Sequence, residues 1–214
     1  MHTIQRLPGD FQAVVLDLDG LLVDTEPIWL RAKHEMFARY GATFELADHV
    51  ALYGSSDGFS ATYFAGRFGL DAADEQAIRM EYLDVVTVML QQGVPTRPGA
   101  RQLLSTLRGR VPLGLATNTK RKLADIILER SGLAGSFDAE ATGDEGRPKP
   151  EPDIYLLACS RLGVPPGHAV ALEDSPLGVR AAKAAGLTCI AIPSEAAVEL
   201  GHADHVAASL RDLF

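Results

Sequence analysis

The feature that most restricts the fold is a regular alternation between short apolar runs and longer helical patterns. The first apolar run, residues 12–16, is continuous and stops at Asp17, which is typical of a strand buried on both faces. Similar runs recur at residues 113–117, 137–142, 169–173 and 188–192. Helical patterns separate them, at residues 99–107, 120–130, 152–162 and 176–185. Because strands and helices alternate, the sequence predicts an α/β fold with a doubly wound (Rossmann-like) parallel sheet.

One long segment interrupts this alternation directly after the first predicted strand. Between Asp24 and Pro95 the pattern is helical, with apolar residues at helical spacing in residues 25–40, 59–68 and 71–92. We expect an all-helical cap domain at residues 24–94, inserted into an α/β core domain made of residues 1–23 and 95–214. The alternative is a helical decoration that packs rigidly on the sheet.

The composition restricts the partners and the compartment. A net charge of −8 disfavours binding to nucleic acids or anionic membranes. The longest apolar runs are far shorter than the roughly 20 residues of a membrane-spanning helix. Cys159 and Cys189 each lie in an apolar stretch, which is typical of small core residues in a reducing compartment. We therefore expect a cytoplasmic protein that binds no nucleic acid and no membrane, and we infer no obligate protein partner.

Polar side chains follow several of the predicted strands. In isolation each has an ordinary role in a turn or at a helix cap. Because ligands of open parallel sheets bind beyond the carboxyl ends of the strands, we expect these side chains to share one cleft. Burying several carboxylates together costs free energy unless a cation offsets their charge, which favours a functional site. The residues are Asp17, Asp19, Thr117, Asn118, Lys149, Glu173 and Asp174.

The acidic members of this set indicate a metal site. Clustered carboxylate oxygens suit a hard divalent ion, and Mg²⁺ is the expected one. Asp17 and Asp174 are the expected side-chain ligands, and Asp19 offers its backbone carbonyl. Glu173 is either a further ligand or a partner of the ligands.

The remaining members suit a phosphate group. Lys149, the Thr117 hydroxyl and backbone N–H groups near Asn118 can hold phosphoryl oxygens. With that charge offset, Asp17 can attack phosphorus and form an aspartyl-phosphate. Asp19, two residues away, can protonate the leaving alkoxide and later activate a water molecule.

Four motifs resemble those of a known family. They are DLDG at 17–20, LATN at 115–118, RPKPEPDIY at 147–155 and LEDSPLGVRAAKAAG at 172–186. In order and spacing they resemble the haloacid dehalogenase superfamily, specifically its β-phosphoglucomutase-like phosphatases with a helical cap. The resemblance covers essentially the whole chain and implies the roles just described, with Asp17 as nucleophile and Asp19 as general acid and base. It also implies phosphoryl transfer rather than dehalogenation, because dehalogenase members lack the second acid.

The predicted cap bears on the choice between a phosphatase and a sugar phosphomutase. A mutase needs a cation for the distal phosphate of its substrate, and residues 40–66 contain no lysine or arginine. Where the mutases carry histidine, lysine and arginine, our alignment places Trp29, Tyr53 and Asp57. We expect substrate selection, suited to a neutral sugar or polyol, at Trp29, Tyr53, Gly54, Ser55, Ser56 and Asp57. The alternatives are a packing role for Trp29 and an ordinary turn at residues 54–56.

Together these observations predict a Mg²⁺-dependent phosphatase that hydrolyses a small phosphorylated metabolite, such as a sugar or polyol phosphate. A β-phosphoglucomutase-type mutase is the second hypothesis. A receiver-like phospho-acceptor module is a remote third, because in receivers the acidic pair follows the first strand and the acceptor aspartate lies on a later one.

Overall fold

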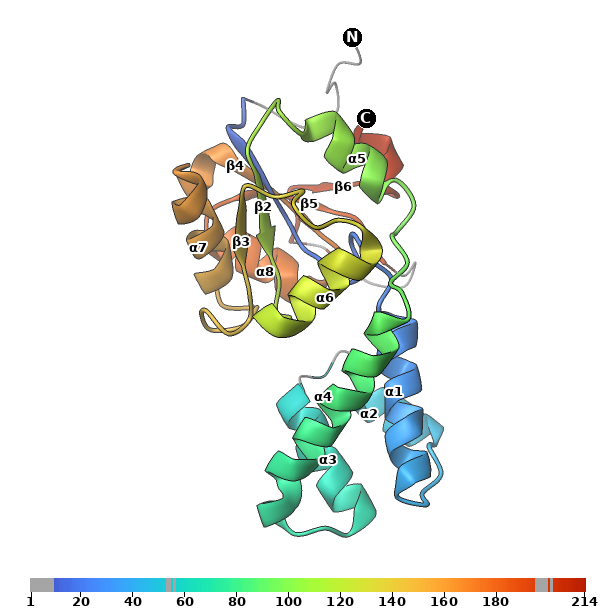
Figure 1. Ribbon diagram of the computed structural model, residues 1–214. Helices are drawn as coiled ribbons and strands as arrows, with labels where there is room; N and C mark the ends of the chain where they lie inside the picture. Colours follow the sequence, from blue (N-terminus) through green and yellow to red (C-terminus); the bar gives the residue numbers. More distant parts are fainter. Residues whose placement is uncertain (1–9, 53–54, 56, 195–199, 201) are drawn as a thin grey trace. The chain divides into compact units, whose positions relative to one another are not determined.

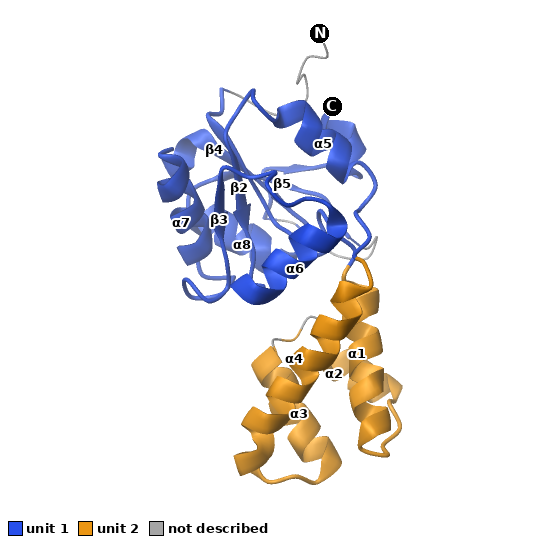
Figure 2. Ribbon diagram, in the orientation of Figure 1, with its two compact units in different colours: residues 1–24, 94–214 blue, residues 25–93 orange. Residues whose placement is uncertain are grey.

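The computed structural model describes residues 10–52, 55, 57–194, 200 and 202–214. The chain forms two compact units (Figure 2), of which unit 1 comprises residues 1–24 and 94–214 and unit 2 comprises residues 25–93. The two junctions differ by one residue from the boundaries expected for a core and an inserted cap, since Asp24 and Val94 belong to unit 1. Among the described residues, no helix combines the length and the apolar character needed to cross a bilayer.

Unit 1 is built around a parallel sheet (Figure 1). Its described strands follow the order β3-β2-β1-β4-β5-β6, and every neighbouring pair is parallel. This confirms the predicted doubly wound fold. The strands are β1 (Ala13–Leu16), β2 (Leu113–Ala116), β3 (Ala139–Ala141), β4 (Ala169–Glu173), β5 (Thr188–Ala191) and β6 (His205–Val206).

The centre of the sheet carries the most deeply buried strands. All residues of β1 and of its neighbours β2 and β4 are buried, and Val15 pairs with Gly114 on one side and Ala171 on the other. Strand β6 is a two-residue edge strand with both residues exposed. Such a short exposed strand has no apolar run, and the sequence did not predict it.

Among the described residues of unit 1, four α-helices connect these strands: α5 (Ala100–Leu107), α6 (Arg121–Ser131), α7 (Asp153–Leu162) and α8 (Pro176–Ala184). Helices α7 and α8 share a core cluster with the sheet residues Ala13, Val15 and Ala171, so they cover one face. Right-handed crossovers place α5 and α6 on the other face. Single-turn 3₁₀ helices lie at η2 (Pro166–His168) and η3 (Leu210–Leu213).

Helices are the only regular secondary structure among the described residues of unit 2. Its elements are α1 (Glu26–Arg39), α2 (Leu46–Leu52), α3 (Asp57–Phe68), η1 (Ala72–Asp74) and α4 (Glu75–Gln91). Aromatic rings form its interior. The ring centre of Phe64 lies 6.1 Å from that of Phe37 and 5.1 Å from that of Tyr82, and both pairs meet edge-on. Helix α2 was not predicted, because its Leu46 and Val50 point to solvent, with 78% and 70% of their surface exposed.

Candidate active site

The first strand ends in a turn at residues 17–23 that packs closely against the Asp174 carboxylate. The Asp17 N–H donates to the Leu172 carbonyl of β4 at 3.1 Å, and the Gly20 N–H donates to the Val23 carbonyl at 2.9 Å. Gly20 has a φ of +86°, and a Cβ there would lie 2.1 Å from Oδ2 of Asp174. Glycine is therefore required at position 20, both for the left-handed backbone and for the space.

Lys149 joins the ends of β1 and β4. Its ammonium contacts Oδ1 of Asp17 and lies 2.5 Å from Oε1 of Glu173. All three groups are buried, with the Glu173 side chain fully inaccessible to solvent. Lys149 was expected at this edge, but a sequence alone allows an ordinary solvated loop lysine; its burial and its two ion pairs exclude that alternative.

Glu173 is held by further donors that the sequence did not reveal. The Tyr155 hydroxyl of α7 donates to its Oε1 at 2.7 Å, and the Asp174 N–H donates to its Oε2 at 3.1 Å. The Ser175 hydroxyl, which also caps α8 by accepting from Gly178, lies 3.2 Å from the same Oε2. Glu173 is thus held by groups from α7, from the residue after β4 and from the N-cap of α8.

A second set of contacts joins Asp19 to the loop after β2. The Thr119 hydroxyl donates to Oδ2 of Asp19 at 2.7 Å, and the Thr117 hydroxyl lies 3.4 Å from the same oxygen. Thr119 was not predicted, although its place one residue after the expected phosphate ligands was a usable signal. The Lys149 N–H donates to the Asn118 side-chain oxygen at 2.8 Å, so the loops that carry these two residues are bonded directly.

The electrostatics reflect an excess of negative charge. Burial, strengthened by the charges of Glu173 and Asp174 and opposed by Lys149, raises the pKa of Asp17 well above its usual range. Burial and the charge of Glu173 raise the pKa of Asp174 to about 7. Burial lowers the pKa of Lys149, but the charges of Asp17 and Glu173 outweigh it and raise that pKa above its ordinary value. The Lys149 ammonium therefore offsets only part of the negative charge of these carboxylates.

These carboxylates fit a hard divalent cation. Asp17, Glu173 and Asp174 each offer one oxygen, and the three oxygens lie within 4.8 Å of one another. Oxygen-only donors of this kind suit Mg²⁺. Burial raises the pKa of Asp17 and of Asp174, and a bound cation would favour the charged forms of both.

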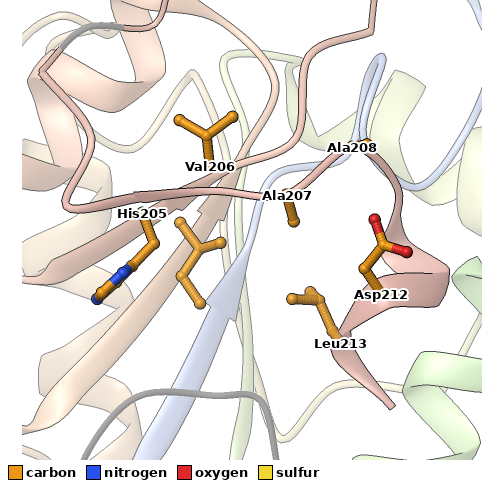
Figure 3. A pocket seen from close by; sticks show the side chains of 7 residues that line it. His205, Val206, Ala207, Ala208, Asp212 and Leu213 are labelled. Carbon is orange, nitrogen blue, oxygen red and sulfur yellow. The ribbon is translucent and has the colours of Figure 1, made fainter.

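A different part of unit 1 holds a cavity that is unrelated to this chemistry. A hollow of about 470 Å³ lies beside the edge strand β6 and is lined by Ile190, Val206 and Leu213, with His205 and Asp212 at its border (Figure 3). None of its lining residues belongs to the four motifs. We place the candidate active site at the cluster of Asp17, Glu173 and Asp174 and not at this cavity, because the volume of a cavity does not by itself indicate a reaction.

The residues predicted to select the substrate lie in unit 2. Trp29 packs against Tyr82 with ring centres 6.1 Å apart, and the Ser55 hydroxyl bonds to Ser60 at 2.9 Å. Asp57 pairs with Arg79 of α4 at 2.8 Å. Tyr53, Gly54 and Ser56 lie outside the described residues.

Unit 2 also holds cationic side chains that lie outside residues 40–66, the segment considered in the sequence analysis. Residues 40–66 lack lysine and arginine, but Arg79 reaches Asp57 from another helix. Lys33 of α1 is buried and donates to the Leu52 carbonyl at 2.8 Å. The missing cations in residues 40–66 are therefore a weaker argument against a mutase than the sequence implied.

Known proteins resemble this chain over most of its length. A family model for haloacid dehalogenase-like hydrolases matches residues 11–186. The fructose-1-phosphate phosphatase YqaB of Escherichia coli (strain K12) is 31% identical over 181 residues, which cover 84% of this chain and 95% of that protein.

Solved structures agree with these relatives. A crystal structure of CbbY from Rhodobacter sphaeroides in complex with phosphate is 32% identical, covers 95% of this chain and 96% of its own, and gives a TM-score of 0.79. The β-phosphoglucomutase of Clostridium difficile gives a TM-score of 0.80 over 95% of this chain and 93% of its own. At 21% identity, the latter supports the fold alone. Because the family model spans the four motifs and the phosphatase relative spans nearly the whole chain, this protein belongs to the haloacid dehalogenase-like hydrolases and is a phosphoric monoester hydrolase.

Proposed function

We propose that the protein is a Mg²⁺-dependent phosphatase that hydrolyses a small sugar or polyol phosphate through an aspartyl-phosphate on Asp17. The observation that carries the proposal is the Lys149 ammonium bonded to both Asp17 and Glu173, with Asp174 beside them. A buried lysine held between carboxylates at the carboxyl ends of β1 and β4 suits an anionic substrate that reacts with a carboxylate. The fructose-1-phosphate phosphatase named above supports the choice of a phosphorylated sugar.

In the first step, an Asp17 carboxylate oxygen attacks phosphorus and the bond from phosphorus to the sugar oxygen breaks. Asp19 gives its proton to the departing alkoxide, so the alcohol leaves neutral. Lys149 and the Thr117 hydroxyl, with backbone N–H groups near Asn118, hold the phosphoryl oxygens during the transfer. The contacts of Oδ2 of Asp19 with the Thr119 and Thr117 hydroxyls would hold its carboxyl in position for these proton transfers.

In the second step, Asp19 takes a proton from a water molecule, and the water oxygen attacks phosphorus. The bond between phosphorus and Asp17 breaks, which releases inorganic phosphate and restores the Asp17 carboxylate. Asp17, Asp174 and the Asp19 carbonyl would hold Mg²⁺, with Glu173 as a fourth ligand or as a partner of the ligands. When bound, Mg²⁺ supplies positive charge that offsets the repulsion between Asp17 and the phosphate.

Substrate selection is assigned to unit 2, acting as a cap. Trp29, Ser55 and Asp57, together with Tyr53, Gly54 and Ser56, are the proposed selecting residues. An indole ring and serine hydroxyls suit the faces and hydroxyl groups of a sugar or polyol. Closure of the cap would exclude bulk water while phosphorus is transferred.

The test is phosphate release by the purified protein with Mg²⁺ across a panel of sugar, polyol and other phosphomonoesters. Wild type should release phosphate, and Asp17→Asn should reduce the rate to background. Asp84→Asn, which changes an exposed aspartate of α4, is the matched control and should retain full activity. Equal activity in Asp17→Asn and wild type would remove Asp17 from its role.

Two additions to the same panel test the other parts of the proposal. β-Glucose 1-phosphate with a bisphosphate primer should yield free phosphate, whereas accumulation of glucose 6-phosphate would indicate a mutase. Trp29→Ala should change the ranking of sugar phosphates more than the rate with p-nitrophenyl phosphate. An unchanged ranking would contradict selection at Trp29.

A further inference from the structure

The loop that carries Lys149 is bonded to two neighbouring helices through Glu145, which is not among the predicted site residues. This loop, residues 142–152, runs from β3 to α7, and Glu145 lies near its start. Oε2 of Glu145 accepts the Thr142 N–H at 3.0 Å and lies 3.1 Å from the Arg121 guanidinium of α6. Its Oε1 lies 2.6 Å from the Arg161 guanidinium of α7. One carboxylate thus joins the loop to the first turn of α6 and the last turn of α7.

The same loop is packed against the residues expected to hold phosphate. The Gly143 N–H donates to the Thr119 carbonyl at 3.1 Å, and a Cβ at Gly143 would lie 1.9 Å from the Asn118 carbonyl oxygen. Farther along, the Lys149 N–H donates to the Asn118 side chain at 2.8 Å. The loop therefore contacts residues 118–119 at two places, through the backbone of Gly143 and through the backbone of Lys149.

Asp144 strengthens the tie on the side of α6. Its Oδ1 accepts the Arg121 N–H at 2.9 Å, so the first residue of α6 is bonded to the loop through its backbone as well as through its side chain. Hydrogen bonds from Arg161, the Thr142 backbone and Arg121 outweigh burial and lower the pKa of Glu145 well below its usual range. The Glu145 carboxylate is therefore charged across the whole pH range in which an enzyme assay is practical.

We propose that Glu145 is a positioning residue for phosphoryl transfer: through Thr142, Arg121 and Arg161 it holds the 142–149 loop against residues 118–119 and so fixes Lys149 and Asn118 relative to Asp17. This inference rests on the proposed function for its catalytic consequence but not for its structural one. The side chains of Glu145, Arg121 and Arg161 keep 26%, 35% and 38% of their surface exposed. Solvent screens pairs that are partly exposed, and amide exchange in the rest of unit 1 reports any loss of global stability in the variant.

The experiment compares Glu145→Ala with Glu151→Ala. Glu151 is the matched control, because it lies in the same loop and its carboxylate is also ion-paired, but with Arg147 at 3.2 Å rather than with Arg121 or Arg161. The first readout is amide hydrogen exchange of residues 117–121 and 142–149. Glu145→Ala should accelerate exchange in both segments and Glu151→Ala should not. The Lys149, Gly143 and Arg121 amides donate hydrogen bonds between the loop and residues 118–121, and we expect these bonds to weaken when Glu145 no longer holds the loop.

The second readout is steady-state kinetics. Displacing a group that holds phosphoryl oxygens by about 1 Å can cost on the order of a hundredfold in rate. We expect kcat of Glu145→Ala to fall by roughly ten- to a hundredfold, with a much smaller change in KM, because the contacts matter most in the transition state. Glu145→Gln keeps an oxygen acceptor and should recover part of kcat. Glu151→Ala should match wild type.

The outcomes separate this inference from the proposed function. If wild type hydrolyses no phosphomonoester, the proposed function fails, while the exchange comparison still decides whether Glu145 orders the two loops. If Glu145→Ala and Glu151→Ala agree in exchange and in kcat, the positioning role is overturned. It is also overturned if exchange in Glu145→Ala accelerates throughout unit 1 and the loss of kcat equals the loss of folded protein.

Discussion

Replacing Gly178 with alanine tests whether the Glu173 carboxylate is confined to one position. Gly178 lies in the first turn of α8, directly against that carboxylate. A Cβ at position 178 would lie 1.9 Å from Cδ and from Oε1 of Glu173 and 2.0 Å from its Oε2. Non-bonded carbon and oxygen atoms normally stay about 3.4 Å or more apart, so the carboxylate would have to move by about 1.5 Å.

The magnitude follows from what that movement breaks. The carboxylate lies 2.5 Å from the Lys149 ammonium and 2.7 Å from the Tyr155 hydroxyl, and a shift of about 1.5 Å takes both beyond hydrogen-bond distance. Hydrogen bonds to charged groups contribute about 1.5–3 kcal/mol each, so losing two costs roughly 3–6 kcal/mol. Alanine is the better helix former by only about 1 kcal/mol. The loss is the larger effect, and we expect a net destabilisation of roughly 2–5 kcal/mol.

The assay is thermal unfolding without added metal, followed for the transition of unit 1. At about 2–4 °C per kcal/mol for a chain of this size, Gly178→Ala should lower the melting temperature by roughly 4–20 °C. Gly66→Ala is the matched control, because a Cβ at this helical glycine of α3 meets nothing within 4 Å. It should stabilise unit 2 by up to about 1 kcal/mol. If Gly178→Ala is as stable as wild type or more so, the carboxylate is not confined and the reasoning is refuted.

Two further predictions concern the metal and the loss of stability at low pH. Mg²⁺ at a hundred times its dissociation constant should stabilise wild type by about 2.7 kcal/mol in thermal unfolding, and Asp174→Asn should abolish that shift; an equal shift in the variant would exclude Asp174 as a ligand. Although burial raises the pKa of Asp48, hydrogen bonds from Arg67, the Glu45 N–H and Tyr63 outweigh it and lower that pKa. Its contribution to the stability of unit 2 is therefore complete above the unfolded pKa of about 3.9 and is lost as the pH falls through the lower folded value. Asp48→Asn should flatten that decline, and unfolding curves of the variant as steep in pH as those of wild type would contradict the assignment.

The sheet could be predicted because its central strands are buried on both faces. Such strands must be continuously apolar, and β1, β2 and β4 are buried at every residue. Helix ends were predictable where glycine permits a left-handed backbone, as at Gly132, which has a φ of +68° and closes α6. Helix α2 and strand β6 were missed because apolar residues that face solvent, such as Val50 and Val206, leave no one-sided pattern.

The main site residues were predictable for a topological reason. The carboxyl ends of parallel strands share one edge, so polar residues after separate strands are brought together whatever the loops do in detail. This argument places Asp17, Glu173 and Asp174 in one cluster, as the structure does. It does not reach Tyr155, whose hydroxyl contacts Glu173 from within a helix. Nor does it reach Thr119, whose contact with Asp19 depends on how one loop turns.

Charge balance in unit 2 shows the limit of reading a sequence window. Residues 40–66 lack basic side chains, and the sequence argument treated this as a local absence of positive charge. In the fold, Arg79 binds Asp57 through both Nε and Nη2. Because helical packing brings together residues that are more than 20 positions apart, the charge next to Asp57 is set by the packing of α3 against α4. If unit 2 selects the substrate as proposed, that selection depends on the part of the chain where sequence spacing says least about proximity.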